Sequence, residues 1–108
     1  MKPLLKWLVI LALVPASVGA QTPELQAGRN KAQTCAVCHG PLGVSSLPDT
    51  PHLAGQPAIY LAAQLRAYRS GARKHEVMAV MAKPLSDEEI SQLASWFSAI
   101  RVEATAPN

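Results

Sequence analysis

The sequence contains little of what a β-structure, a large core or a membrane span requires. It has 108 residues, two cysteines and one phenylalanine, and 5% of its residues are aromatic. After residue 20, no run of about four to eight residues shows the alternating β-branched pattern of a strand. The apolar run Trp7–Val14 has eight residues, whereas a membrane-spanning helix needs roughly 20. We therefore expect one domain at most, and an all-α fold.

The first 20 residues have the three parts of a secretory signal peptide. Lys2 and Lys6 precede the apolar run, and the compact residues Val18-Gly19-Ala20 follow it where a signal peptidase would cleave. A retained membrane anchor is the alternative, but the run is too short and ends at Pro15. We expect cleavage after Ala20, a mature chain of residues 21–108 with no membrane span, and a periplasmic location.

The mature chain is small and nearly neutral. Residues 21–108 contain eight lysines and arginines and seven acids, a net charge of +1 with histidine neutral, so charge gives no case for nucleic-acid binding. With 88 residues, a hydrophobic core alone would be marginal. A disulfide, a metal or a cofactor is expected to complete it.

The two cysteines point to that cofactor. Cys35-Ala36-Val37-Cys38-His39 is the signature of covalent c-type haem attachment. Two thiols one helical turn apart can bond to the two vinyl groups of one haem, while the next residue places its imidazole beneath the iron. The motif occurs once, so one haem c is expected, with Cys35 and Cys38 as attachment sites.

Three other roles for the cysteines are less consistent with the chain. A disulfide closing so short a loop would remove little unfolded-state entropy, and it leaves His39 without a role. A zinc site would need further ligands, but His52 and His75 lie at no recurrent zinc spacing. A thioredoxin-like pair, with a lowered thiol pKa, belongs to a fold that needs strands.

Three main helices are expected around the haem. The first begins at Thr22 and Pro23 and ends near Thr34, and the third begins at the capping box that opens with Ser86. The second runs from about Pro57 to Gly71 with an apolar stripe of Ile59, Leu61, Ala62, Leu65 and Tyr68. Arg66, Arg69 and Arg73 form a basic ridge on one face of this helix, which is either a solvated face or a site for a partner or for the haem propionates.

Two connections complete the prediction. Residues 40–56 are rich in proline, glycine and serine and are expected to form a long loop that wraps the haem edge. Residues 75–84 are expected to form a second loop, which contains both mature methionines. A thioether opposite an imidazole raises the reduction potential of haem iron, so Met78, Met81 and His75 are all candidates for the second axial ligand.

These residues together resemble the class I cytochromes c, in particular the small bacterial c-553 kind and the single domains of the dihaem cytochromes c-four. The resemblance covers about residues 24 to 100. It rests on Gly28 seven residues before the first cysteine, Cys35-x-x-Cys38-His39-Gly40, Pro51-x-Leu53-Ala54-Gly55-Gln56, Tyr60 with Gln64-Leu65, Gly71-x-Arg73, and Met78 seven residues before Leu85-Ser86-Asp87.

The resemblance implies a role for individual residues. His39 would be the proximal iron ligand, and Met78 the distal one, with Met81 as the alternative. The backbone carbonyl of Pro51 would accept the Nδ1 proton of His39 and so fix its ring. Gly28 would cross an aromatic residue of the last helix, Trp96, where the family has Tyr or Phe.

The resulting expectation is an electron-transfer protein and not an enzyme. An iron with both axial positions closed by the protein leaves no site for substrate, so the chain would pass single electrons between redox partner proteins. Two alternatives remain. The chain is the haem c subunit of a larger oxidoreductase complex, or, if neither methionine binds iron, a five-coordinate haem protein that binds gas or reduces peroxide.

Overall fold

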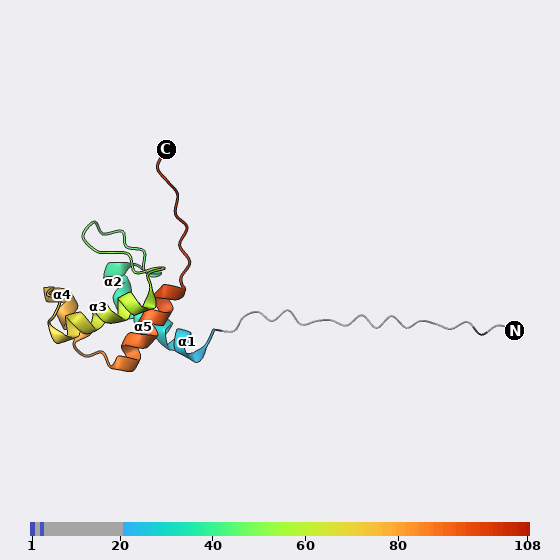
Figure 1. The fold of residues 1–108 in the computed structure, drawn as a ribbon, viewed down its shortest axis with the longest axis horizontal. Helices are drawn as coiled ribbons and strands as arrows, with labels where there is room; N and C mark the ends of the chain where they lie inside the picture. Colours follow the sequence, from blue (N-terminus) through green and yellow to red (C-terminus); the bar gives the residue numbers. More distant parts are fainter. Residues whose placement is uncertain (2, 4–20) are drawn as a thin grey trace.

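All regular structure in residues 21–108 is helical, as expected. The computed structural model describes residues 1, 3 and 21–108, so most of the expected signal peptide lies outside the described residues. The elements are α1 (Pro23–Ala32), the 3₁₀ turn η1 (Gln33–Cys35), α2 (Ala36–His39), α3 (Ala58–Ser70), α4 (Glu76–Ala82) and α5 (Asp87–Ala99). In Figure 1, α1 and α5 cross at one side of the molecule, while α3 leads from α5 toward α4 at the other.

The expected helix ends are confirmed. The Thr22 hydroxyl accepts a hydrogen bond from the Leu25 N–H at 3.2 Å, and Pro23 opens α1. Ser86 and Glu89 form the reciprocal capping box at the start of α5. Gly71 ends α3 in the left-handed conformation, with φ of 83°.

The connection between α3 and α5 differs from the expectation, because residues 75–84 are not a loop throughout. Glu76–Ala82 form α4, and the His75 side chain acts as its N-cap, with Nδ1 accepting the Met78 N–H at 3.2 Å. Histidine is not among the residues that commonly cap helices. The start of α4 was therefore not visible in the sequence, and both methionines are helical.

The core lies where α1, α3 and α5 meet. Its buried members are Ala32, Leu61, Leu93, Ala94 and Phe97, and Ile90 on α5 is fully buried. Ile59 is an exception to the expected stripe of α3, since its side chain is 87% exposed. The core is thus concentrated on α5, and α4 contributes only Ala82 to the buried apolar residues.

The crossing of α1 and α5 depends on a residue without a side chain. A Cβ at Gly28 would lie 2.1 Å from the Gln92 carbonyl oxygen and 2.8 Å from Trp96 Cβ, so the expected contact with Trp96 is confirmed. Backbone and Cβ atoms cannot move aside without shifting a whole helix. Arg29 lies over the Trp96 ring, 5.9 Å from its centroid, beside the same crossing.

Gly28→Ala is expected to lower the free energy of unfolding by about 3 kcal/mol or more, because the helices must separate. Gly71→Ala is the matched control: a Cβ there meets nothing within 4 Å, and only the left-handed backbone costs energy, about 1 kcal/mol. Denaturant unfolding of the two purified variants makes the comparison. Equal losses would show that the crossing is not close-packed.

Candidate functional site

The two cysteines lie close together in the chain on a short helical segment. Cys35 ends η1 and is the N-cap of α2, while Cys38 is within α2. Neither forms a disulfide; Cys35 is half-buried and Cys38 is exposed. Burial raises the pKa of the Cys35 thiol, although Thr34 and Lys31 partly oppose this effect. A raised pKa is the opposite of what a thioredoxin-like nucleophile requires.

His39 is buried and oriented by the loop. Its side chain is 8% exposed, and Nδ1 lies 2.8 Å from the carbonyl oxygen of Pro51. Because a carbonyl can only accept, Nδ1 is the donor, and in the neutral ring Nε2 then keeps its lone pair. This is the contact that the resemblance implies, and it leaves Nε2 able to bind a metal ion.

The loop from residue 40 to residue 56 is folded back on itself by side chains. His52 Nδ1 accepts the Ser45 N–H at 2.8 Å, and the Ser45 hydroxyl donates to the Cys38 carbonyl at 3.1 Å. These bonds connect α2 to the residue next to Pro51. Sequence reasoning missed His52 in this role, because a Ser–His contact seven residues apart in a loop has no recognisable pattern.

Met78 and Met81 occupy different environments on α4. Met78 is half-buried and lies four residues before Ala82, which is fully buried, so the two share the inner side of the helix. Met81 is 40% exposed. This arrangement favours Met78 as the methionine that faces inward.

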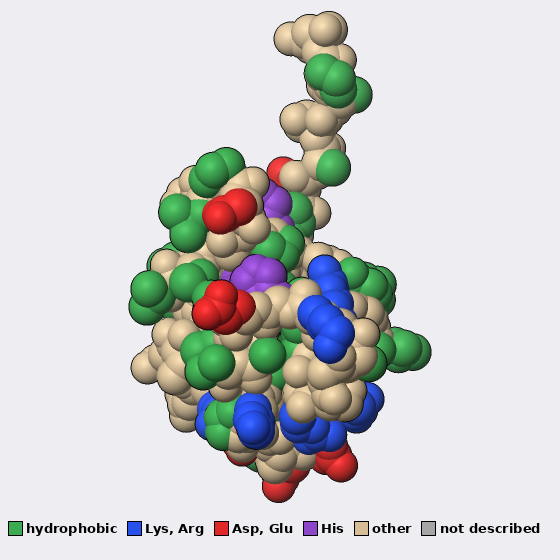
Figure 2. Space-filling view, turned by 90° about the vertical axis from the view of Figure 1, so that its left-hand side faces the viewer, with side chains coloured by type: hydrophobic (Ala, Val, Ile, Leu, Met, Phe, Trp, Pro, Cys, Tyr) green, Lys and Arg blue, Asp and Glu red, His purple; other side chains and the backbone are tan. Residues whose placement is uncertain are grey.

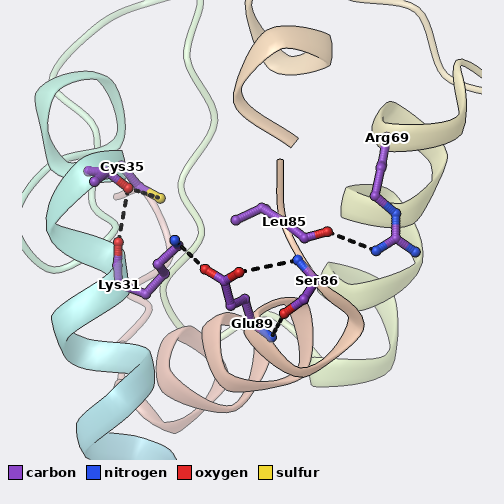
Figure 3. Close-up of polar contacts among 7 residues, drawn as sticks. Lys31, Cys35, Arg69, Leu85, Ser86 and Glu89 are labelled. Carbon is purple, nitrogen blue, oxygen red and sulfur yellow. Dashed lines mark hydrogen bonds and ion pairs between the residues drawn. The ribbon is translucent and has the colours of Figure 1, made fainter. Parts of the chain in front are cut away.

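Arg69 fixes the corner between α4 and α5 (Figure 3). One guanidinium nitrogen donates to the Leu85 carbonyl at 2.9 Å, and the other donates to the Asp87 carboxylate at 2.6 Å. The hydrogen bond and charge of Arg69 lower the pKa of Asp87. On the other side of the start of α5, Lys31 of α1 pairs with Glu89, and this contact lowers the pKa of Glu89.

A second arginine of the ridge, Arg73, also contacts side chains within the chain. Arg73 lies over the Tyr68 ring, 4.8 Å from its centroid, and donates to Gln64 at 2.7 Å. Two of the three ridge residues therefore have structural partners within the chain. A haem-propionate role for Arg69 is not supported, because both its terminal nitrogens are used at the corner.

Arg69→Met is expected to reduce the acid sensitivity of the fold. A carboxyl group whose pKa is lowered in the folded state stabilises the protein above its unfolded pKa, about 3.9 for aspartate, and this stability is lost as pH falls. Without Arg69, the pKa of Asp87 rises toward its ordinary value. The unfolding free energy should then be lower at pH 7 and should fall less between pH 7 and pH 3.

Asp87→Asn supplies the control for this prediction. This substitution removes the carboxyl group whose pKa Arg69 lowers. Adding it to Arg69→Met should therefore change the pH dependence of the unfolding free energy little further. If the unfolding free energy of Arg69→Met falls with pH as steeply as that of the wild type, Asp87 is not the group concerned.

Two features are absent from the described residues. Within residues 21–108, no three side chains of His, Cys, Asp or Glu are grouped so that they could hold a metal ion. No helix in the part of the chain that the structure describes has both the length and the apolarity to cross a membrane.

An all-α chain with one CxxCH segment, whose histidine is oriented by a loop carbonyl, defines a class I c-type cytochrome. The chain belongs to the cytochrome c family, whose model matches residues 25–100. It is an electron-transfer protein and not an enzyme, and it carries one covalently attached haem c, as expected.

Individual relatives agree with this assignment. Cytochrome c-554(548) of Halomonas halodenitrificans is 43% identical over 78 residues, which cover 69% of this chain and 94% of that protein. The thiosulfate dehydrogenase electron acceptor of Thiomonas intermedia is 42% identical over 88 residues, 81% of this chain and 37% of that protein. The chain thus spans nearly all of one relative and less than half of the other.

Solved structures give the same fold. Reduced cytochrome c4 from Pseudomonas stutzeri matches with a TM-score of 0.68 and 32% identity, over 79% of this chain and 53% of that one. Thiosulfate dehydrogenase from Marichromatium purpuratum also matches with a TM-score of 0.68, at 37% identity, over 83% of this chain and 22% of that one. The expected class I cytochrome c fold is therefore confirmed.

Proposed function

We propose that the chain is a periplasmic monohaem cytochrome that carries single electrons between redox partner proteins. The observation that carries this proposal is the His39 imidazole, buried and held through Nδ1 by the Pro51 carbonyl, with Nε2 free. A proximal haem ligand needs this orientation and tautomer. Cys35 and Cys38, both free thiols on the same segment, would form the thioether bonds.

Met78 is the proposed distal ligand, with Met81 as the alternative. The inner position of Met78 on α4, beside the buried Ala82, supports this choice. His75 supports it indirectly, because its capping bond fixes the first turn of α4, where Met78 lies. A thioether and an imidazole are ligands that suit haem iron in an electron carrier.

The described residues fit a haem in their apolar chemistry as well. The 40–56 loop presents Leu42, Val44 and Leu47, each 45% exposed or more, and these side chains can cover an apolar macrocycle. The haem, when bound, supplies reversible one-electron chemistry at iron. The protein's part is to hold His39 in one orientation, to provide Met78 from α4 and to exclude water with the loop.

A single expression experiment tests this function. The full chain is produced in a bacterial host with the haem-attachment machinery, and the periplasmic fraction is examined by haem stain and intact mass. We expect one haem adduct on a chain that begins at Gln21, and a spectrum that is reduced and reoxidised reversibly. A haem-free periplasmic chain, or a chain retained in the membrane with residues 1–20 attached, would contradict the proposal.

A second candidate is a haem subunit of a larger oxidoreductase. The relative from Thiomonas intermedia is named as an electron acceptor of thiosulfate dehydrogenase, and the Marichromatium purpuratum structure is that of a thiosulfate dehydrogenase. Purification of a tagged chain from its native host decides between the two, because a subunit remains with its enzyme through size exclusion and a free carrier elutes alone.

A further inference from the structure

The charge of the mature chain is concentrated in one segment. Residues 66–83 contain five lysines and arginines and one acid, a net charge of +4 with histidine neutral. The remainder of residues 21–108 contains three basic residues and six acids, a net charge of −3. A chain with a total charge of +1 therefore has a strong charge asymmetry, which can orient it toward a charged partner.

The basic side chains of residues 66–83 differ in whether they have a partner within the chain. Arg69 is committed to the Leu85 carbonyl and Asp87. Arg66, Arg73, Lys74 and Lys83 are exposed, and we call these four residues the α3–α4 basic surface. The Arg73 guanidinium donates to Gln64 and lies over the Tyr68 ring. Arg66 lowers the pKa of Asp87 through its charge only.

Helix α4 gives this surface an apolar centre. Met78 and Ala82 lie on the inner side of α4, so Val80 and Lys83 lie on the outer side, neighbours at three-residue spacing. Val80 is 70% exposed and Val77 is 54% exposed. Glu76 is the one acid of the segment. Exposed valines bordered by cations have the composition of a protein–protein contact with an apolar centre and a polar rim.

The distribution is visible on the side of the molecule that carries α4. Figure 2 shows lysine and arginine side chains gathered over the middle and lower part of this face, with hydrophobic side chains beside them and acidic groups along its lower edge. The proposed distal ligand Met78 belongs to the same helix. A partner seated on this surface would therefore lie against the helix that contacts the haem iron.

We propose that the α3–α4 basic surface is the site where a redox partner docks, through an acidic surface beside the partner's own redox centre. This inference rests on the proposed electron-carrier function. Charge complementarity selects an acidic protein, because opposite charges steer association and fix its orientation. A nucleic acid is disfavoured by the total charge of +1 on residues 21–108.

The test uses small charged oxidants to measure the electrostatic field at the place on the holoprotein surface where electrons leave. The ferrous protein gives one electron to hexacyanoferrate(III), a trianion that becomes hexacyanoferrate(II), or to tris(1,10-phenanthroline)cobalt(III), a trication that becomes cobalt(II). Lys83→Glu should slow the reaction with the anion at least about threefold at low ionic strength and accelerate that with the cation. Both effects should vanish near 1 M salt, where the Debye length is about 3 Å.

Arg101→Glu is the matched control, with the same change of net charge. Arg101 follows the C-terminal end of α5, and in Figure 1 this end of α5 lies on the other side of the molecule from α4. Its effect on either rate should be small. Equal effects of Lys83→Glu and Arg101→Glu would overturn the docking surface while leaving electron transfer intact, whereas a protein that reacts with neither probe would refute the electron-carrier function itself.

The class of partner is tested with two polyanions. Poly-L-glutamate should slow the hexacyanoferrate(III) reaction of the wild type and affect Lys83→Glu much less. Phosphatidylglycerol vesicles at the same concentration of charge should have little effect. Inhibition by the vesicles equal to or stronger than that by poly-L-glutamate would overturn the assignment of an acidic protein in favour of a membrane surface.

Discussion

A chain in which Cys35 and Cys38 are both replaced by alanine is expected to carry no covalent haem and to be largely unfolded. The physical reason is the small size of the protein core: Ile90 is the one large side chain that is fully buried among the described residues. Residues 21–108 number 88, and a domain of this size buries so modest a share of its surface that we expect the cofactor to be needed for a robust fold. Haem stain, intact mass and far-ultraviolet circular dichroism measure the outcome.

The single variants Cys35→Ala and Cys38→Ala are the controls. Each keeps one thiol and the proposed ligand His39, so each should retain some haem and a cooperative, less stable fold. A double variant that melts cooperatively without haem would contradict the central place of the cofactor in this fold.

Met78→Ala is expected to lose the weak near-infrared absorption of methionine-ligated ferric haem. Its reduction potential should fall by roughly 100 mV or more, because the axial ligand sets the potential strongly. Met81→Ala is the matched control on the same helix. Since Met81 is 40% exposed, its replacement should keep the band and shift the potential only slightly. Potentiometric titration followed by near-infrared spectra of the three proteins makes the comparison.

The structure changes how His75 is used in this experiment. His75→Ala removes the N-cap of α4 and would weaken that helix by about 1 kcal/mol. A spectral change in this variant would then not distinguish the loss of an iron ligand from the loss of the helix. His75→Asn keeps a capping side chain and removes a potential iron ligand, so its spectrum should match that of the wild type. Loss of the band in Met81→Ala but not in Met78→Ala would identify Met81 as the ligand.

The sequence predicted those parts of the fold that depend on local chemistry. Thr22, Pro23, Gly71 and the Ser86–Glu89 box each act on backbone groups within one helical turn, so their residue types alone announced the helix ends. The close crossing at Gly28 was predicted from the family resemblance and is present.

The sequence did not predict features that depend on contacts between distant segments or on unusual caps. Helix α4 begins with a histidine cap, which carries no recognisable signal. Ile59 fits the apolar period of α3 but is 87% exposed, although Ala58 and Leu61 of the same turn pack in the core. Arg69 resembles its neighbours in the ridge, and only the corner at Leu85 and Asp87 distinguishes it.

The measurement that tests the account most directly is a redox titration of the purified holoprotein, followed by optical spectra with and without carbon monoxide. We expect a reversible one-electron transition, a methionine band in the ferric state, and no binding of carbon monoxide to the ferrous protein at neutral pH, because the proposed ligands His39 and Met78 would occupy both axial positions. A high-spin spectrum without the band, together with ready binding of carbon monoxide, would contradict the electron-carrier assignment and favour a five-coordinate haem protein.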